Sequence, residues 1–205
     1  MAINAQNLDE AEKKYNVGGS DWIRVEEGDN KVRIIDTVYA DYGSHFDQKN
    51  NKSYTCIGKD KGCPFCKKGN DPRVRYLVWA IDKNDGEMKK LEFGHSIAKQ
   101  LATYANDEEY GVEKYGFPYW INIKRKGTGL DTEYNVIAGR KEVKLTDEQI
   151  EDYEAAEDLH EFVEKRKDIT REDFNIDTEY SNGDDDEDIP VIEDDDDINS
   201  EDIPF

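Results

Sequence analysis

The chain has 205 residues, enough for one sizeable domain with appendages, and a formal net charge of −21. The acidity is concentrated near the C-terminal end: residues 1–141 hold 23 Lys and Arg against 22 Asp and Glu, residues 142–176 hold 5 against 13, and residues 177–205 hold none against 14. No apolar run reaches the roughly 18–20 residues that cross a bilayer, and the first residues lack the order of a signal peptide, so the sequence excludes a membrane-spanning helix and predicts a cytoplasmic protein.

The first predicted element is an N-terminal arm, residues 1–20, a short helix or arm that ends at a Gly-Gly-Ser sequence. Alternating or uniformly apolar residues between turn formers then predict a series of short strands. An Asn-Asp-Gly hairpin turn at residues 84–86 joins two of them, and residues 96–104 predict one amphipathic helix. The predicted strands cover residues 22–25, 31–39, 74–81, 88–93, 117–125 and 133–138.

This order of elements predicts a mainly β protein with a few helices, of the α+β class. At least five short strands with one intervening helix are typical of a small, partly open barrel such as the OB-fold, here at residues 21–141. Thr146, with Gln149 three residues later, predicts a capping box that opens a helical segment at residues 142–176. Residues 177–205 lack hydrophobic periodicity and contain acidic blocks that repel themselves, which predicts a disordered tail.

All three cysteines lie in a segment rich in turn formers, residues 41–72, which predicts a metal-binding loop inserted in the barrel. His45, Cys56, Cys63 and Cys66 follow the pattern H-x10-C-x6-C-x2-C. Three thiolates and one imidazole complete a closed tetrahedral site, the usual arrangement of a structural zinc. The alternatives are three free buried cysteines with a surface histidine, or a redox-active Cys-x-x-Cys, which needs a strand-to-helix setting.

Two other histidines compete with His45 for the fourth ligand position. His95 begins the helical pattern and is expected to have a capping or core role, whereas His160 lies in an acidic helix and is expected to face solvent. The sequence therefore predicts one structural zinc ion per chain, held by the first four residues.

The core combines positive charge with aromatic side chains. Residues 31–126 hold 18 Lys and Arg against 13 Asp and Glu. A positive groove for phosphates and aromatic faces for bases are what sequence-independent binding of single strands requires. The alternative is that the aromatic residues fill the core and the lysines form ordinary surface. The basic candidates are Lys31, Arg33, Lys59, Lys61, Arg73, Arg75, Lys124, Arg125 and Lys126. The aromatic candidates are Tyr39, Tyr42, Phe46, Tyr54, Tyr115 and Trp120.

The tail ends in a sequence that reverses its acidic character. Asp202, Ile203, Pro204 and Phe205 place apolar side chains beside a free carboxylate, a compact ligand for a pocket with a basic rim. A polyanion tethered to a basic groove also competes with nucleic acid at a high local concentration. The tail is therefore expected to dock partner proteins through its tip and to weaken binding of nucleic acid at low salt.

Two resemblances follow from these motifs. His45 with Cys56, Cys63 and Cys66 resembles the zinc loop of the T4-type phage single-stranded DNA-binding proteins (the helix-destabilising, gene 32-like group). That resemblance implies an OB-fold with an inserted zinc loop, an acidic C-terminal region, and DNA in the cleft between loop and barrel. The spacing of the ligands is shorter here, and the family's basic N-terminal arm is not evident in residues 1–20, which puts strong cooperativity in doubt.

The tip at residues 202–205 resembles the acidic C-terminus of bacterial SSB, residue by residue. Together the resemblances imply a non-enzymatic protein that coats single-stranded DNA in phage or mobile-element replication, recombination or repair, within a bacterial host cell. They imply partners among replication, recombination and repair proteins. The main alternative is a zinc-stabilised adaptor or DNA mimic whose acidic tail occupies DNA-binding sites on other proteins. A metal-dependent nuclease would need clustered carboxylates or an open metal site, and the core sequence shows neither.

Overall fold

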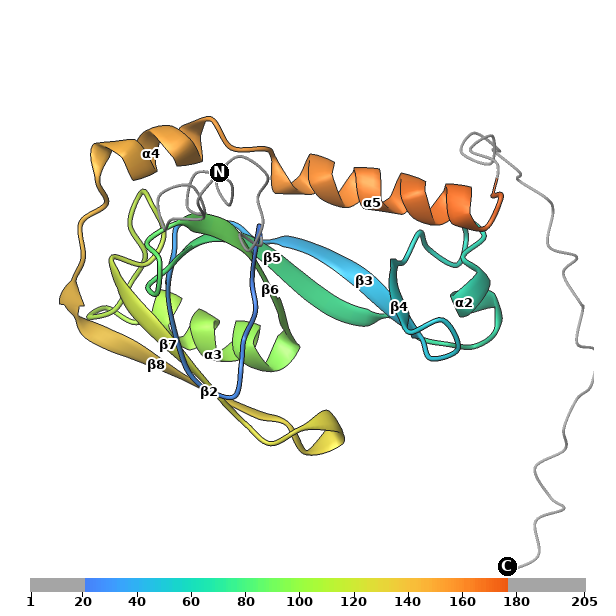
Figure 1. Cartoon of the computed structure of the whole chain (residues 1–205), viewed down its shortest axis with the longest axis horizontal. Coiled ribbons are helices and arrows are strands. Elements are labelled where there is room, and N and C mark those ends of the chain that lie inside the picture. The colour runs from blue at the N-terminus through green and yellow to red at the C-terminus, as the bar shows by residue number, and fades with distance from the viewer. Residues whose placement is uncertain (1–20, 177–205) are drawn as a thin grey trace, which may run out of the picture.

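The computed structural model describes residues 21–176, and within them it shows a mainly β protein with four α-helices, which confirms the predicted fold class (Figure 1). The strands are β1 (Trp22–Ile23), β2 (Gly28–Ile34), β3 (Ala40–Asp47), β4 (Lys52–Thr55), β5 (Arg73–Asp82), β6 (Met88–Gly94), β7 (Tyr119–Lys126) and β8 (Glu133–Glu142). The helices are α2 (Pro64–Lys67), α3 (His95–Ala105), α4 (Asp147–Glu154) and α5 (Leu159–Asp173), with a short 3-10 turn at Gly129–Asp131. The predicted N-terminal arm, acidic tail and docking tip lie outside the described residues.

The strands form one sheet in the order β1-β6-β5-β2-β7-β8, and β3 pairs with both β5 and β4. All pairs are antiparallel except β1 with β6, which is parallel. Within the described residues β8 and β6 do not pair, so the sheet is not closed. Helix α3 covers that side instead, and the Gln100 amide bonds the β8 backbone at Tyr134 O (3.0 Å) and Val136 N (2.9 Å). These bonds satisfy polar groups that a neighbouring strand would otherwise satisfy.

The main core lies between α3 and the inner face of the sheet. Alternation along the strands places every second side chain on this face, so the apolar residues of each strand meet those of its neighbours. Ile97, Ala98 and Leu101 supply the buried face of α3. Fully or nearly buried strand residues of this core are Val32, Ile34, Val78, Ala80, Leu91, Phe93, Tyr119, Ile121, Ile123 and Val136.

Two of the predicted boundaries are wrong. The strand expected over residues 31–39 ends at Ile34. The reason is Asp36, whose buried carboxylate turns inward and accepts a hydrogen bond from the Trp79 backbone N–H. Val38, farther along the chain, is exposed. The segment expected to be a loop, residues 41–72, contains β3 and β4, a hairpin whose polar residues masked its strand character. Both differences come from contacts between distant parts of the chain, which local alternation does not report.

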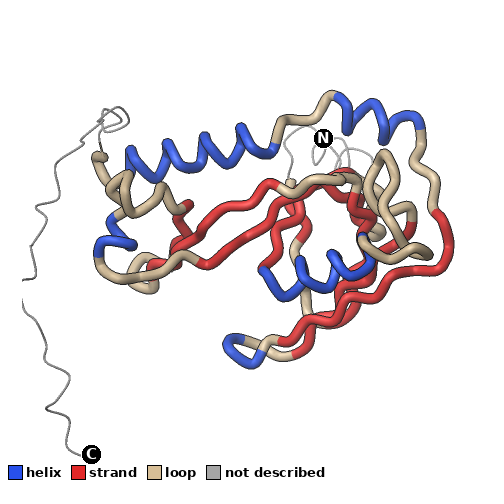
Figure 2. The backbone as a smooth tube through the Cα atoms, turned by 180° about the vertical axis from the view of Figure 1, so that it is seen from behind, coloured by secondary structure: helices blue, strands red, loops and turns tan. Residues whose placement is uncertain are grey.

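Strands β3, β4, the start of β5 and helix α2 extend from the body of the sheet as an arm, residues 41–74 (Figure 1). Helix α5 runs along this arm from the sheet to its far end, as Figures 1 and 2 both show. Leu159 and Val163 of α5 form a second core with Ala40, Tyr42 and Leu77 on the outer face of β3 and β5. One face of the arm is therefore covered by α5.

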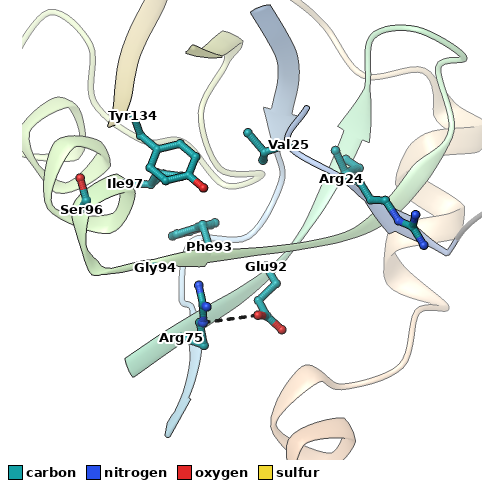
Figure 3. Close-up of a pocket in the computed structure, with 10 residues that line it drawn as sticks. Arg24, Val25, Arg75, Glu92, Phe93, Gly94, Ser96, Ile97 and Tyr134 are labelled. Atoms are coloured by element: carbon teal, nitrogen blue, oxygen red, sulfur yellow. Dashed lines mark ion pairs between the residues drawn. The ribbon is translucent and has the colours of Figure 1, made fainter. Parts of the chain in front are cut away.

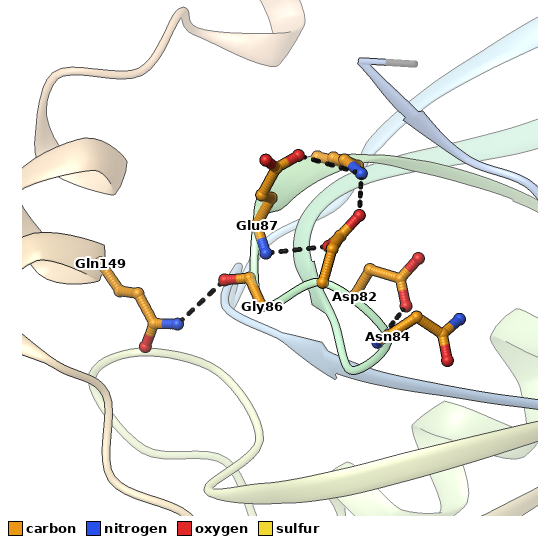
Figure 4. Close-up of polar contacts among 7 residues, drawn as sticks. Asp82, Asn84, Gly86, Glu87 and Gln149 are labelled. Atoms are coloured by element: carbon orange, nitrogen blue, oxygen red, sulfur yellow. Dashed lines mark hydrogen bonds and ion pairs between the residues drawn. The ribbon is translucent and has the colours of Figure 1, made fainter. Parts of the chain in front are cut away.

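The start of α4 is fixed by two predicted turn features. Thr146 and Gln149 form the expected capping box, and the Gln149 side-chain amide also donates to the carbonyl of Gly86 at 3.2 Å (Figure 4). Gly86 belongs to the predicted hairpin turn between β5 and β6, where Asp82 accepts from the Asn84 N–H at 2.9 Å. The capping box and the hairpin turn are thus confirmed, and they anchor α4 to the sheet. Within residues 21–176 no helix is both long and apolar enough to cross a membrane.

Candidate metal centre and nucleic-acid interface

The four predicted metal ligands converge at the far end of the arm. The Cys56 sulfur lies 3.9 Å from that of Cys63 and 3.5 Å from that of Cys66. His45 Nε2 lies 3.5 Å from each of the Cys63 and Cys66 sulfurs, and all four ligand atoms lie within 4.8 Å of one another. A tetrahedral zinc with Zn–S of about 2.3 Å and Zn–N of about 2.0–2.1 Å requires sulfur pairs about 3.8 Å apart and S···N pairs about 3.6 Å apart. The four printed separations are close to these values, so the four residues could hold one metal ion of this kind.

Local backbone structure explains why these residues meet. His45 lies on β3 and Cys56 follows β4, so the hairpin brings them together. Cys63 is the N-cap of α2, with a proline after it, and Cys66 lies one turn later on the same short helix. Gly62 has a φ of 86°, a left-handed conformation that favours glycine, and its turn directs Cys63 back toward the hairpin.

The electrostatics of the cluster suit a bound cation. Burial, followed by the hydrogen bonds and charges of its two sulfur neighbours, raises the pKa of the Cys66 thiol to about 12. Burial opposes ionisation of Cys63 as well, but the backbone N–H groups of Cys66 and Phe65 outweigh it and lower the pKa of Cys63. Burial lowers the pKa of His45, which keeps the imidazole in its neutral, metal-binding form. A divalent cation would stabilise the thiolates that burial alone disfavours.

Aromatic rings surround the cluster and join it to α5. His45 stacks on Phe65 at a centroid distance of 5.0 Å, and Phe65 contacts Tyr54 at 5.3 Å. Phe174, the C-cap of α5, packs edge-on against both Tyr54 (5.0 Å) and Phe65 (5.4 Å). Asp173 on the same helix forms an ion pair with Lys52 of β4 at 2.6 Å. The metal cluster and the end of α5 therefore share one small core.

The alternatives for these residues find little support in the geometry. His45 is 3% exposed and lies 3.5 Å from two of the sulfurs, so it is not a surface histidine beside unrelated cysteines. Helix α2 is only four residues long, unlike the helix of a redox-active Cys-x-x-Cys. His95 lies on α3 beside Tyr76, and His160 is exposed on α5, so neither approaches the cluster. Within residues 21–176 this is the one group of His, Cys, Asp and Glu able to hold a metal ion, and it contains no carboxylate.

Several of the predicted DNA-binding residues are accessible. On the arm, Phe46 is 50% exposed and the lysines and Arg73 are exposed; on the body of the sheet, Lys31 is exposed on β2, and Lys124 and Lys126 are exposed beside the β7–β8 turn. Figures 1 and 2 show the β7–β8 hairpin and the arm extending in the same direction from the sheet. The accessible basic residues are Lys31, Lys59, Lys61, Arg73, Lys124 and Lys126, with Arg75 half-buried.

Three of the predicted contacts are buried, so the structure does not offer them to a ligand. Arg33 is 4% exposed on β2, and burial lowers its pKa. Tyr42 is 4% exposed because it lies under α5, where its hydroxyl donates to Glu92 and accepts from Arg166 at 2.7 Å. Tyr54 is 8% exposed, within the aromatic core of the arm. Tyr42 and Tyr54 are thus covered by α5 and by its C-cap, Phe174.

The remaining predicted residues have mixed surroundings. Arg125 donates to the carbonyl of Val25 at 3.0 Å, which gives it a structural role. Tyr115 donates to Glu154 of α4 at 2.9 Å, accepts from Lys114 at 2.6 Å and packs edge-on against Tyr153, so its ring is engaged with α4. Trp120 is half-buried with the Lys83 ammonium 5.5 Å above its ring. Tyr39 is half-buried, and burial raises its pKa to about 12.

The sequence analysis missed an aromatic stack at the base of the arm. The rings of Phe93 and Tyr76 stack at 6.0 Å, and Tyr76 continues onto His95 at 6.3 Å, with a 3.2 Å hydrogen bond between its hydroxyl and His95 Nδ1. Phe93 is buried, Tyr76 is half-buried and His95 is exposed. The stack therefore runs from the core to the surface. Tyr76 lies on a strand that is apolar on both faces, so only its contacts in the folded chain show that it is half-buried between Phe93 and His95.

Comparison with known proteins adds one similarity. The chain is 30% identical over 79 residues to a protein of Escherichia phage T5 described as a probable ssDNA-binding protein. The match covers 37% of this chain and 30% of the phage protein, so the matched region spans less than a third of that relative. No protein-family model matches the chain, and no solved structure matches it. The similarity is thus to a phage ssDNA-binding protein in general and does not single out the T4-type group.

Proposed function

We propose that this chain is a non-enzymatic single-stranded DNA-binding protein that acts in phage or mobile-element replication, recombination or repair, in the cytoplasm of a bacterial host. The observation that carries the proposal is the stack of Phe93, Tyr76 and His95 at the base of an arm with exposed lysines. Aromatic faces beside positive charge bind single strands of any sequence, because every base can stack and every nucleotide carries a phosphate. The similarity to the phage T5 protein supports the same class of ligand.

The sheet supports an OB-type core for this function. Strands β6-β5-β2-β7-β8 lie side by side in that order, and α3 lies between β6 and β7 in the chain. We assign residues 21–141 to this core, with residues 41–72 as the metal-binding insertion and residues 142–176 as a helical segment. OB-folds bind nucleic acid on one strand face and between two loops. In this proposal the arm, residues 41–74, and the β7–β8 hairpin correspond to those loops, because the arm connects β2 to β5 and the hairpin joins the last two strands.

The metal in this proposal is one structural zinc. His45 and the three cysteines fill all four positions of a tetrahedron, which leaves no open position for a substrate or water. Zinc would supply no chemistry to a reaction. It would hold the β3–β4 hairpin, α2 and the aromatic core of the arm in one arrangement, so that the arm can face the DNA as a rigid body.

In this proposal the C-terminal tail has two roles: its acidic residues compete with DNA for the positive surface, and its tip links the protein to partner proteins. Residues 177–205, with 14 acidic residues and no basic one, would compete with DNA for the positive surface. The tip, Asp202, Ile203, Pro204 and Phe205, would dock replication, recombination or repair proteins. The N-terminal residues 1–20 form a separate arm in this division.

Binding to labelled oligonucleotides tests the proposal. Fluorescence anisotropy should show that the chain binds a single-stranded oligonucleotide more tightly than the matched duplex, and that added salt weakens the complex. Labelled DNA is a better reporter than intrinsic tryptophan fluorescence, because Trp22 and Trp79 pack under α5. An adaptor or DNA mimic would bind neither oligonucleotide, and that result would sink the proposal.

A variant pair then locates the interface. Tyr76→Ala removes the middle ring of the stack and should weaken single-strand binding about tenfold, the usual effect of losing one base-stacking ring. Tyr115→Ala is the matched control, since it removes a tyrosine that faces Glu154 and α4. Its affinity should stay within about twofold of the original protein. Equal losses in both variants would show that the stack is not the binding surface.

A further inference from the structure

A pocket of about 300 Å³ lies where the sheet is not closed, beside the stack (Figure 3). Strand β1 pairs with β6 only at Lys90 and Leu91, and the chain then leaves β6. The edge of β6 from Glu92 to Gly94 therefore faces the pocket. The opposite wall comes from the first turn of α3 and from Tyr134 of β8. The volume is at the lower end of ligand pockets, about 300–1,000 Å³, which suits one nucleotide better than a longer segment.

The pocket has an apolar floor with one ring above it. Phe93 and Ile97 are buried and line its inner surface. Figure 3 shows the half-buried ring of Tyr134 above Phe93, with its hydroxyl directed toward the side of Val25. A flat apolar slot with a polar edge is the environment in which a base stacks and hydrogen-bonds.

The rim of the pocket favours an anion. Arg75 lies at the rim beside Glu92, the one acidic residue of the lining, whereas Arg24 lines the side of Val25 with its guanidinium directed outward (Figure 3). The Glu92 carboxylate is shared, since it accepts from the Tyr42 hydroxyl and pairs with Arg166 at 3.5 Å. Its contact with Arg75 Nε is longer, 3.6 Å. Arg75 therefore retains capacity for a phosphate.

Two further details keep the guanidinium groups available. Gly94 has no side chain, and a Cβ at that position would lie 3.4 Å from Arg75 Nη1, so glycine leaves Arg75 room over the edge of β6. Arg24 is exposed, and within residues 21–176 it forms no ion pair. A phosphate at the rim would meet Arg75 beside a neutralised carboxylate, with the exposed charge of Arg24 adding to the positive potential nearby.

The pocket is continuous with the stack. Phe93 belongs to both: one side of its ring faces Tyr76, and it also lines the pocket. His95, the exposed end of the stack, directly precedes the α3 residues Ser96 and Ile97 that line the pocket. A strand with one base on the exposed ring of His95 would therefore have its next nucleotide at the mouth of the pocket.

We propose that this pocket holds one nucleotide of the bound strand, with its base against Tyr134 and its phosphate at Arg75. The inference rests on the proposed single-strand binding and deepens it, because it assigns one subsite of the interface. A single strand can turn a base out of its stack into such a pocket at little cost, whereas a duplex must first unpair. The pocket would therefore contribute to the preference for single strands.

The test uses the full chain and oligonucleotides that carry the fluorescent base 2-aminopurine at successive positions. In the original protein, 2-aminopurine at one position should be protected from the quencher acrylamide. Tyr134→Ala should abolish that protection and weaken binding about tenfold. Val25→Trp should do the same by filling the pocket while leaving the stack intact. Ile137→Ala, on the outer face of the same strand, is the matched control and should behave as the original protein.

The outcomes separate this inference from the proposed function. If the original protein binds the oligonucleotides but no position is protected, or if both pocket variants bind as tightly as the control, the pocket is no subsite although the protein binds DNA. If the original protein binds no oligonucleotide, the proposed function fails and the subsite with it. Protection at one position that either pocket variant removes, in a protein with unchanged circular dichroism, supports the subsite.

Discussion

His45 is the residue on which the metal centre depends most. Its Nε2 atom faces two sulfurs at 3.5 Å, and its Nδ1 atom is buried without a hydrogen-bond partner among the described residues. A buried imidazole with one unsatisfied nitrogen, and only weak sulfur partners at the other, is unfavourable because its polar atoms have lost their contact with water. A metal ion at Nε2 would remove much of that cost. The stacking of His45 on Phe65 further fixes the orientation of the ring.

We predict that His45→Ala weakens zinc binding at least about 100-fold. Loss of a residue that merely supports a ligand costs about 10–100-fold in metal affinity, so loss of a ligand costs at least as much. Competition with a chromophoric chelator measures this affinity, and elemental analysis of protein purified without added metal should give one zinc per chain. His160→Ala removes an exposed histidine of α5 and should bind zinc as the original protein does. A metal content near zero in the original protein would contradict the assignment.

At the residue scale, the sequence was enough to predict which four residues form the candidate metal site. It was not enough to predict which aromatic residues are exposed to bind DNA. Cysteine and histidine have few roles at such close spacing, so His45 and Cys63 could be paired without knowing the fold. Exposure of an aromatic residue depends on what covers its side of the strand. Tyr42 is covered by a helix more than a hundred residues later, whereas Tyr76 reaches solvent next to α3. No local pattern carries that information.

At the scale of elements, α5 connects the sheet to the metal arm. Its first turns bury Leu159 and Val163 on the outer face of β3 and β5, and Phe174 at its other end packs into the aromatic core beside the metal ligands. The helix buries few residues along its length, so it depends on contacts at both ends for its stability. It therefore acts as a brace that fixes the arm relative to the sheet.

We predict that Phe174→Ala lowers the free energy of unfolding by about 2 kcal/mol, less than the 3–5 kcal/mol of a fully buried phenylalanine because this side chain is half-buried. Urea unfolding measures the change. The loss should shrink when a chelator removes the metal, because the core that receives Phe174 then loses its order. Ile169→Ala, exposed on the same helix, should change stability by less than about 0.5 kcal/mol. A loss that is identical with and without chelator would show that the brace and the metal are independent.

The elements themselves were predictable where the apolar pattern was regular. Strands β5, β6, β7 and β8 were predicted within a few residues, and so were α3 and the start of α4, since each repeats one period or carries a cap. The parallel pairing of β1 with β6 was not predicted. It ends at Leu91, which among the described residues leaves the rest of the β6 edge unpaired beside the pocket. Pairing depends on which edges the rest of the sheet leaves free, and two residues of β1 carry no pattern that specifies it.

At the scale of the whole molecule, opposite charges occupy different parts of one chain. The last described residue, Ile176, lies beside the metal arm: it and the Lys67 ammonium are each 3.6 Å from the position that a side chain at Gly62 would take. The acidic residues 177–205 therefore begin at a point where the described chain lies beside the exposed lysines of the arm, residues 41–74. A tethered polyanion that starts there is at high local concentration over the arm, which is the condition for competition with DNA.

We predict that deletion of residues 177–205 tightens binding to single-stranded oligonucleotides about tenfold at low salt. The gain should disappear near 1 M salt, where charges are screened beyond about 3 Å. A chain of full length whose acidic blocks at residues 184–188 and 194–197 are changed to Asn and Gln should behave like the deletion, which separates charge from length. Removal of residues 202–205 alone should leave DNA affinity unchanged and abolish capture of partner proteins. Unchanged or weaker affinity after the full deletion, measured by anisotropy at matched salt, would show that the tail does not compete with DNA.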